Sequence, residues 1–176
     1  MFESGKINIV KGSNGSGKTT LFLILNKIDC DFIGTFSYFE NEVKKEYSIS
    51  DVVYVPSKNC LITYYDLEHN LNIFKTYDIN LFCSEYNIEQ NTLPCDLSGG
   101  EQEIVSLYRV KDLKDKIILL DESTSYLDDK NFDKMLDIID NLSLNNLVIF
   151  ATHDVRVLAK YSTIYHLING DLKKDD

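Results

Sequence analysis

Short apolar runs recur along the chain, separated by longer segments of mixed polarity. Runs with little polar alternation are typical of strands that are covered on both faces of a sheet. Pro56 ends the second run, as expected for a residue that cannot donate to a sheet ladder. The pattern predicts β-strands at residues 7–10, 52–55, 117–120, 147–151 and 164–167.

The segments between these runs carry apolar residues with helical spacing. The stretch 57–96 is expected to be mostly helical, with apolar positions at Leu67, Leu71, Phe74, Leu81 and Phe82. Other helices are predicted at 18–26, 98–109, 132–141 and 155–160. Strands that alternate with helices indicate an α/β fold with a mostly parallel sheet. We expect one domain over residues 1–176, with a small helical subdomain inserted at about 57–112.

A turn rich in glycine and serine joins the first predicted strand to the first helix. It fits the pattern G-x-x-x-x-G-K-[ST] completely, and Thr20 follows it: Gly12, Ser13, Asn14, Gly15, Ser16, Gly17, Lys18 and Thr19. Glycines let backbone N–H groups turn toward phosphate oxygens, and a helix N-terminus favours an anion. Residues 12–20 are therefore predicted to bind a nucleotide, with Lys18 on the β- and γ-phosphates and Thr19 on Mg²⁺. The alternative, a flexible turn with a chance lysine, is disfavoured by the strand and helix around it.

Two acidic residues follow the predicted strand at 117–120. A parallel strand delivers its carboxyl end to the ligand crevice of such a sheet, so Asp121 and Glu122 are expected there. Asp121 is predicted to hold Mg²⁺, directly or through its water, and Glu122 to polarise an attacking water as general base. Alone, the pair is equally compatible with a solvated acidic turn. The phosphate loop favours the metal-site interpretation.

A second glycine-containing segment begins the predicted helix at 98–109. Ser98, Gly99, Gly100 and Glu101 place a hydroxyl group and glycine amides at a helix N-terminus. This arrangement predicts a second anion site. Without further context, a serine that caps the helix together with Glu101 is a comparable interpretation.

Taken together, these motifs resemble those of the nucleotide-binding domain of the ABC ATPase superfamily. The phosphate loop at 12–20, the segment LSGGE at 97–101 and the apolar strand ending in Asp121 and Glu122 occur in the family's order. Residues 123–128 resemble the family's D-loop, and residues 152–154 resemble its switch-histidine segment. The resemblance extends from about residue 7 to residue 170 and implies a P-loop NTPase core.

The resemblance also implies cofactors and a partner subunit. ATP and Mg²⁺ are the implied cofactors, and two such domains would form an ATP-dependent dimer, either a homodimer or a heterodimer with another ABC ATPase. Residues 98–101 of one chain would then act on the ATP held by the phosphate loop of the other. His153 would contact the γ-phosphate and position Glu122, and Asp128 would communicate across the dimer.

The sequence departs from the family pattern in three places. Ser57 stands where the family usually has a glutamine on Mg²⁺, so we expect Ser57 to reach the metal only through water. Only 11 residues precede Gly12, so the N-terminal antiparallel subdomain and its adenine-stacking aromatic residue are expected to be truncated or missing. Phe2 is expected to pack in the core instead. Ser123 replaces the D-loop proline, and the arginine often found after the signature is replaced near Ile104.

Composition and charge limit the possible partners. With 18 basic and 28 acidic residues the formal net charge is −10, which argues against binding to nucleic acid or to an anionic leaflet. The four cysteines form no C-x-x-C pair, and we expect reduced structural thiols. No secretory signal and no apolar run of bilayer-spanning length are present, so no direct membrane insertion is expected.

The leading hypothesis is an ATPase that powers a separately encoded integral membrane permease, with peptide or bacteriocin export as the suggested role. The chain is expected in the cytoplasm, held at the membrane face by the permease, whose short helix would dock beside Ser57 and the helical subdomain. Two alternatives stay open: a non-transport ABC ATPase of DNA repair or translation, and a nucleotide-binding switch with little hydrolysis. The absence of coiled coils and tandem domains disfavours the first, and the presence of Lys18 and Glu122 disfavours the second.

Overall fold

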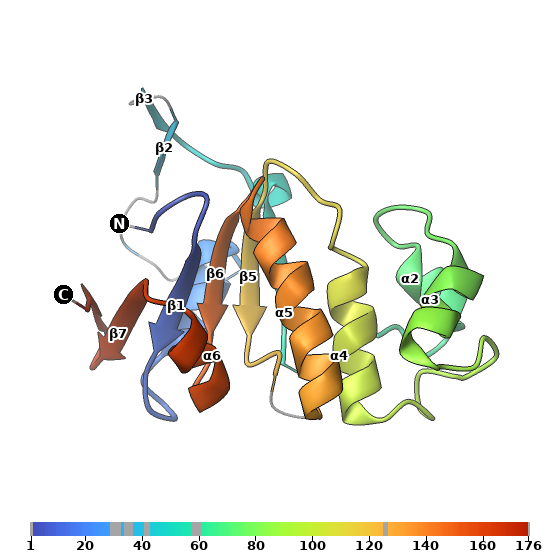
Figure 1. Cartoon of the computed structure of the whole chain (residues 1–176). Helices are drawn as coiled ribbons and strands as arrows, with labels where there is room; N and C mark the ends of the chain where they lie inside the picture. Colours follow the sequence, from blue (N-terminus) through green and yellow to red (C-terminus); the bar gives the residue numbers. More distant parts are fainter. Residues whose placement is uncertain are drawn as a thin grey trace.

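The computed structural model describes residues 2–28, 33, 37–40, 43–57, 61–124 and 127–175. Within these ranges the centre of the molecule is a six-stranded sheet in the order β4-β5-β6-β1-β7-β8 (Figure 1). All neighbouring strands are parallel except β7 and β8. The predicted α/β fold with a mostly parallel sheet is confirmed. Its strands are β1 (Ile7–Lys11), β4 (Val52–Val55), β5 (Ile117–Asp121), β6 (Leu147–Ala151), β7 (Ile164–Ile168) and β8 (Asp171–Lys174).

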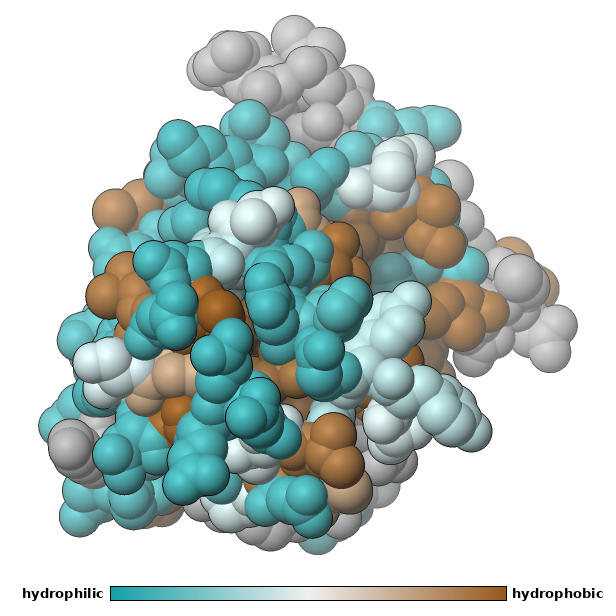
Figure 2. Space-filling model, turned by 90° about the vertical axis from the view of Figure 1, so that its right-hand side faces the viewer, coloured by the Kyte–Doolittle hydropathy of each residue, from teal (hydrophilic) through white to brown (hydrophobic). Residues whose placement is uncertain are grey.

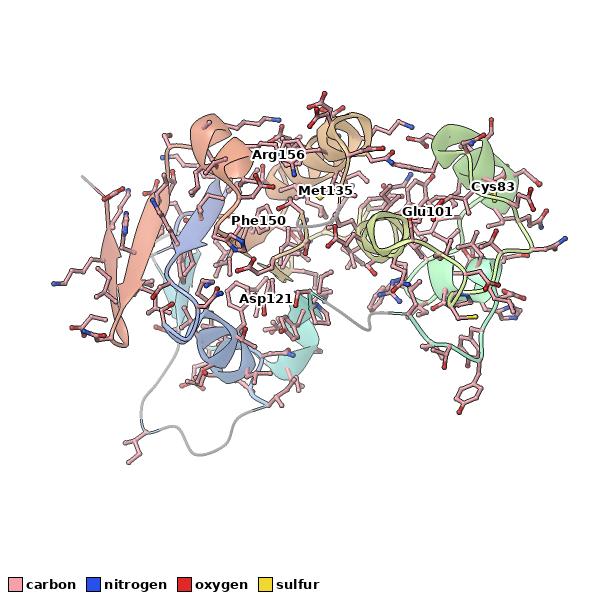
Figure 3. The ribbon with its side chains drawn as sticks, turned by 90° about the horizontal axis from the view of Figure 1, so that it is seen from below. Cys83, Glu101, Asp121, Met135, Phe150 and Arg156 are labelled. Carbon is pink, nitrogen blue, oxygen red and sulfur yellow. The ribbon has the colours of Figure 1, made fainter. Side chains whose placement is uncertain are left out.

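Helices cover both faces of the sheet, as its doubly buried strands require. On one face, Phe22 of α1 packs with Leu119 and Ile149 of the sheet. On the other face, Met135 and Ile139 of α5 belong to the larger apolar core, which also includes residues of α4 and α6. Figure 3 shows α1 and α5 on opposite sides of the strands. The helices are α1 (Lys18–Leu25), α4 (Gly99–Tyr108), α5 (Asp129–Ser143) and α6 (Val155–Lys160).

The parallel order brings the carboxyl ends of β1, β5 and β6 to one edge of the sheet. Ala151 at the end of β6 is paired with Val10 on one side and with Asp121 on the other. The phosphate loop, which follows β1, and the acidic pair at the end of β5 therefore flank the same residue. This edge is the crevice in which α/β sheets of this kind bind ligands.

The segment between β4 and β5 contains the helical insert, which we define as residues 61–108. Its helices are α2 (Leu67–Leu71), α3 (Ile79–Tyr86) and α4, and α2 and α3 lie beyond α4 on the side away from β1 (Figure 1). The buried Phe82 ring lies 4.7 Å from the Tyr108 ring and 5.0 Å from the Tyr86 ring, measured between centroids. These aromatic contacts join α3 to α4.

The stretch 57–96 is less helical than the sequence predicts. Asn87 adopts a left-handed conformation that ends α3, and residues 88–98 continue as turns and extended chain. Leu67, Leu71 and Phe82 are buried as their helical spacing suggests, whereas Phe74 and Leu81 are exposed. Leu81 neighbours Phe82 in a helix that buries one face only, so the two side chains point in different directions.

The antiparallel strand pairs of the described residues follow the phosphate loop in the sequence. A hairpin of β2 (Tyr38–Glu40) and β3 (Val43–Lys45) follows α1, next to the 3₁₀ helix η1 (Ile49–Asp51). Among the described residues before Gly12, β1 is the only strand. Phe2 packs edge-on against Tyr165 with centroids 4.9 Å apart, in agreement with a packing role.

The remaining general features concern membranes and thiols. In the part of the chain that the structure describes, no helix combines the length and apolar character needed to cross a bilayer.

Cys83 and Cys95 are free, and Cys30 and Cys60 lie outside the described residues. Burial raises the pKa of the Cys83 thiol, which lowers its reactivity.

Replacing Phe82 with alanine should lower the free energy of unfolding by about 3–5 kcal/mol, because it leaves a cavity among the aromatic rings of the helical insert. Leu81→Ala is the matched control, since Leu81 is 61% exposed and Phe82 is fully buried. The control should stay within about 0.5 kcal/mol of the wild type. Denaturant unfolding measures both, and equal losses would contradict this account of the insert.

Candidate functional site

The phosphate loop wraps around its own lysine. Lys18 Nζ donates to the carbonyl oxygens of Gly12 at 2.9 Å and Ser13 at 3.3 Å. A side chain at Gly12 has no room, because a Cβ atom there would lie 2.9 Å from the backbone carbonyl oxygen of Leu167. Gly17 has a φ of +99°, in the region that favours glycine. The turn that the motif predicts thus needs glycine at these two positions for distinct steric reasons.

The loop opens onto the N-terminus of α1. Gly17 occupies the N-cap position, no side chain caps this helix, and its first turn contains no acidic residue. The free N–H groups and the helix dipole favour an anion at this position. Ser16 Oγ is buried in the loop without a hydrogen-bond partner among the described residues, and a bound phosphate would supply one.

The structure brings together the two predicted metal ligands, which are 102 residues apart in sequence. Thr19 Oγ1 donates to Asp121 Oδ2 at 2.9 Å, and Asp121 is only 3% exposed. A hydroxyl and a carboxylate are ligands that suit Mg²⁺. Tyr54, which the sequence did not single out, also donates to Asp121 Oδ2, at 3.1 Å. Ser57 follows β4 and is half-buried, and the described contacts of Asp121 do not include it.

Glu122 lies between the predicted lysine and the predicted histidine. Its Oε1 is 3.6 Å from Lys18 Nζ, and its Oε2 is 2.5 Å from His153 Nδ1. The backbone of Glu122 has a φ of +54°, and its N–H donates to the carbonyl of Ala151 at 2.8 Å. This turn directs the carboxylate toward the phosphate loop. The three residues predicted to be catalytic therefore lie side by side.

A cavity of about 560 Å³ lies against the phosphate loop. Its walls are residues 11–16, His153 and the end of β7. His166 on β7 also lines this cavity, and its Nε2 lies 3.0 Å from Asp175 Oδ2. Nothing in the sequence pointed to His166, because only the pairing of β7 with β1 brings it beside the loop.

The segment at 98–101 does not meet the phosphate loop of its own chain in the described contacts. Ser98 Oγ accepts from Glu101 N at 3.3 Å, and Glu101 Oε2 accepts from Ser98 N at 2.7 Å. This is a capping box at the start of α4, so the capping interpretation holds for the single chain. A capping role does not exclude an anion site, because the remaining N–H groups of the first turn still face outward.

Asp128 and a neighbouring arginine organise the segment after Glu122. Asp128 accepts from Asn131 N at 2.8 Å and so caps α5, while Ser125 and Tyr126 lie outside the described residues. Arg156 on α6 donates to Asp154 at 2.8 Å and to the carbonyls of residues 124 and 127. Burial acts to raise the pKa of Asp154, but the hydrogen bonds from Arg156 outweigh it and lower the pKa. The sequence did not identify Arg156, since its contacts with the carbonyls of residues 124 and 127 come from a segment about 30 residues away.

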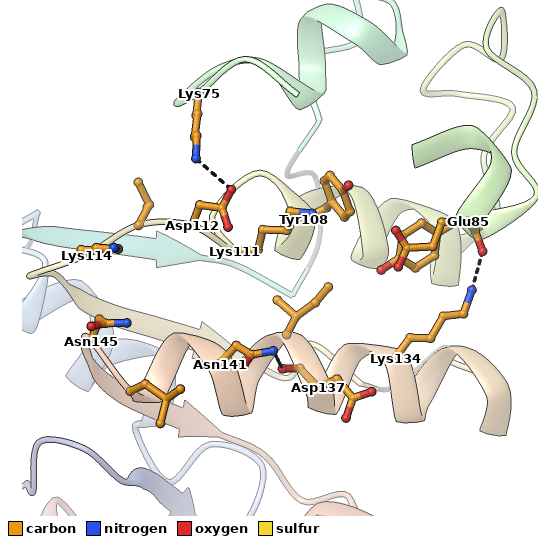
Figure 4. A pocket seen from close by; sticks show the side chains of 14 residues that line it. Lys75, Glu85, Tyr108, Lys111, Asp112, Lys114, Lys134, Asp137, Asn141 and Asn145 are labelled. Carbon is orange, nitrogen blue, oxygen red and sulfur yellow. Dashed lines mark hydrogen bonds and ion pairs between the residues drawn. The ribbon is translucent and has the colours of Figure 1, made fainter. Parts of the chain in front are cut away.

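A larger cavity of about 610 Å³ contains none of the predicted site residues (Figure 4). It lies between α3, the end of α4 and α5. Lys75 bonds Asp112 at 3.0 Å there, and the ammonium group of Lys111 lies 3.5 Å above the Tyr108 ring. The chemistry of the predicted site is concentrated at the phosphate loop instead.

Comparison with known proteins agrees with this geometry. Residues 1–125 match the protein family described as ABC transporter. The chain belongs to the ABC transporter family. As a member of this family it is an ATP-binding subunit and an ATPase, and the resemblance noted in the sequence is confirmed.

Several characterised relatives are similar over nearly the whole chain. The lipoprotein-releasing system ATP-binding protein LolD of Buchnera aphidicola is 26% identical over 96% of this chain and 82% of its own length. The zinc import ATP-binding protein ZnuC of Ehrlichia ruminantium is 30% identical over 96% of this chain and 71% of its own length. The macrolide export protein MacB of Campylobacter jejuni is 25% identical over 98% of this chain, which spans 30% of MacB.

Solved structures support the fold. The ATP-binding cassette MJ0796, in a dimeric post-hydrolysis state bound to ADP and Pi, matches with a TM-score of 0.77 and 22% identity, over 100% of this chain and 87% of that one. An ATP-binding subunit of an ABC transporter matches with a TM-score of 0.81 and 18% identity, over 99% of this chain and 80% of that one. At these identities the similarity concerns the fold alone.

Lys18→Ala should weaken ATP binding on the order of 100-fold, because it removes a charge-assisted contact worth about 3 kcal/mol. Lys173→Ala, which removes an exposed lysine from β8, is the matched control. Titration of a fluorescent ATP analogue measures both affinities. Equal affinity of Lys18→Ala and the wild type would contradict the assignment of the phosphate loop.

Proposed function

We propose that this chain binds Mg²⁺-ATP and hydrolyses it to power a separately encoded membrane permease. The observation that carries the proposal is the convergence of Lys18, Thr19, Asp121, Glu122 and His153 at one sheet edge. Each has the chemistry that its step requires, and the residues come from three separate segments that follow or end β1, β5 and β6. An accidental acidic turn would not also hold a lysine and a histidine against the phosphate loop.

The metal site is supported by the donor set. The Thr19 hydroxyl and the buried Asp121 carboxylate, 2.9 Å apart, are oxygen ligands of the type that Mg²⁺ prefers. Bound there, Mg²⁺ would neutralise charge on the phosphate oxygens. Ser57 is a weaker candidate, because its short side chain lies outside the described contacts of Asp121.

The chain's own groups then have distinct tasks. Lys18 exchanges its carbonyl contacts in the loop for the β- and γ-phosphate oxygens, which are stronger partners for an ammonium group. Glu122 takes a proton from the attacking water as the bond between the γ-phosphorus and the bridging oxygen breaks. His153 holds the Glu122 carboxylate in place through the 2.5 Å contact and lies close enough to the cavity to meet the γ-phosphate.

The second anion site at 98–101 is proposed to act on a neighbouring chain. Ser98, Gly99 and Gly100 begin α4, and the described contacts do not join them to the phosphate loop of the same chain. A head-to-tail dimer, with a second copy or with another ABC ATPase, would place these residues against the partner's ATP. Asp128 at the start of α5 lies on the same edge of the molecule and would take part in that interface.

The permease is proposed to bind the helical insert. Several large apolar side chains of the insert are exposed: Ile62, Tyr64, Tyr65, Ile73, Phe74, Leu81 and Leu93. Figure 2 shows apolar patches among hydrophilic side chains on the side of the molecule that carries α2 and α3. Exposed apolar groups gathered on one subdomain are typical of an interaction surface. Binding there would hold the chain at the cytoplasmic face of the membrane.

The cargo is less defined than the ATPase chemistry. The names of the relatives refer to lipoprotein release, macrolide export and zinc import. These names do not include peptide or bacteriocin export, which stays a prediction. A nucleotide-binding switch with little hydrolysis is the second candidate, favoured by serine at position 57.

Glu122→Gln should lower the rate of ATP hydrolysis at least about 100-fold while ATP binding persists, because the amide cannot accept the proton from water. An ATP-bound dimer should accumulate on a sizing column. Glu89→Gln, at an exposed position outside the site, is the matched control and should hydrolyse ATP like the wild type. Normal hydrolysis by Glu122→Gln would exclude Glu122 as the general base, and a wild type that binds but never hydrolyses ATP would favour the switch.

Phe74→Asp should abolish stimulation of ATP hydrolysis by membrane vesicles that contain the permease, because it puts a charge on the proposed docking surface. Hydrolysis by the chain alone should not change. Leu144→Asp is the matched control, since Leu144 is 71% exposed and Phe74 is 51% exposed, and Leu144 lies at the end of α5 outside the insert. Equal stimulation of Phe74→Asp and the wild type would contradict docking at this position.

A further inference from the structure

We propose that Tyr54 is a positioning residue for the Asp121 carboxylate in the metal site. The inference deepens the proposed function and rests on it. Tyr54 is not part of any motif that identified the site. Its role comes from the place of β4 beside β5 and from a hydrogen bond that the sequence alone does not show.

The sheet places the Tyr54 ring on the same face as the carboxylate. Tyr54 is the register partner of Leu119, and Asp121 lies two residues beyond Leu119, so all three side chains point toward α1. The Tyr54 hydroxyl reaches forward to Asp121 Oδ2 at 3.1 Å. The buried Phe22 of α1 meets the Tyr54 ring edge-on, with centroids 6.2 Å apart at 81°, and restricts its motion.

Two donors therefore hold the same carboxylate oxygen. Thr19 Oγ1 approaches Asp121 Oδ2 from α1, and the Tyr54 hydroxyl approaches it from β4. A buried carboxylate needs such donors, because it has lost its water. If the Thr19 hydroxyl became a ligand of Mg²⁺, Tyr54 would still hold Oδ2. The orientation of the carboxylate, and so the direction of its other oxygen, is preserved.

The hydrogen bond from Tyr54 to Asp121 is of particular importance because residue 57 is a serine. The described contacts of the Asp121 carboxylate come from Thr19 and Tyr54, and Ser57 is not among them. Tyr54 therefore restricts the motion of the Asp121 carboxylate. It lies on β4, the strand that precedes Ser57. Loss of its hydroxyl should weaken the binding of Mg²⁺ more than the binding of the nucleotide without metal.

The test is Tyr54→Phe, which removes the hydroxyl and keeps the ring against Phe22. The matched control is Tyr47→Phe, because Tyr47 belongs to the same core cluster and its hydroxyl donates to the backbone carbonyl of Leu25 at 2.9 Å, away from Asp121. Binding of a fluorescent, non-hydrolysable ATP analogue is measured in EDTA and over a Mg²⁺ titration. Turnover is measured over the same titration, and thermal unfolding in EDTA checks the fold.

For Tyr54→Phe the Mg²⁺ concentration at half-saturation should rise about 10-fold in both titrations, the size expected for one lost hydrogen bond to a charged group. Binding in EDTA should stay unchanged, and Tyr47→Phe should match the wild type in its Mg²⁺ dependence. If Tyr54→Phe unfolds, Tyr54→Met serves as a second variant without the hydroxyl.

Other outcomes would overturn the inference in distinguishable ways. An unchanged Mg²⁺ dependence in Tyr54→Phe would reject the positioning role and leave the proposed function intact. Equal shifts in both phenylalanine variants would show a general effect of losing a buried hydroxyl group. A wild type that binds the analogue equally well with and without Mg²⁺ would reject both the metal site and the role of Tyr54.

Discussion

The site depends on one hydrogen bond between distant parts of the chain, from the Thr19 hydroxyl to the Asp121 carboxylate. It forms because β1 and β5 lie parallel on either side of β6, so that the loop after β1 and the end of β5 both flank Ala151. The strands are buried on both faces, so neither can slip by one residue without exposing apolar side chains. The packing of the core therefore fixes the distance between the two predicted metal ligands.

Around this bond the charged groups of the site lie in contact with one another. Lys18 is held by loop carbonyls and lies 3.6 Å from Glu122, and Glu122 is in turn held by His153. Such pairing limits the cost of burying a lysine and an acidic residue close together. An entering polyphosphate would offer Lys18 a stronger partner, and Glu122, held by His153, lies beside Lys18 as the proposed mechanism requires. The contacts among the chain's own side chains thus hold these groups close together.

Two proposed interaction surfaces lie apart from the phosphate loop: the segment at 98–101 and the helical insert. The segment at 98–101 caps and begins α4, and the described contacts do not join it to the phosphate loop of its own chain. The proposed mechanism therefore places it against a second chain. The helical insert presents exposed apolar side chains at the far end of the sheet from β8. Because α4 belongs to the insert and is capped by Ser98, the proposed second anion site and the proposed permease surface lie on the same subdomain.

Local sequence was sufficient to predict the phosphate-loop turn and the buried strands, because glycine conformations, helix capping and apolar runs act over a few residues. The order of the short motifs carried the resemblance to the family. Those same local rules overestimated the helix content of residues 57–96 and missed β2, β3 and β8, whose short or polar strands depend on neighbours for their pairing. The contact of Thr19 with Asp121, the placement of Glu122 between Lys18 and His153, and the roles of Tyr54, Arg156 and His166 come from tertiary structure. Each depends on which strand lies beside which, and strand order is set by the packing of the whole sheet rather than by any single segment.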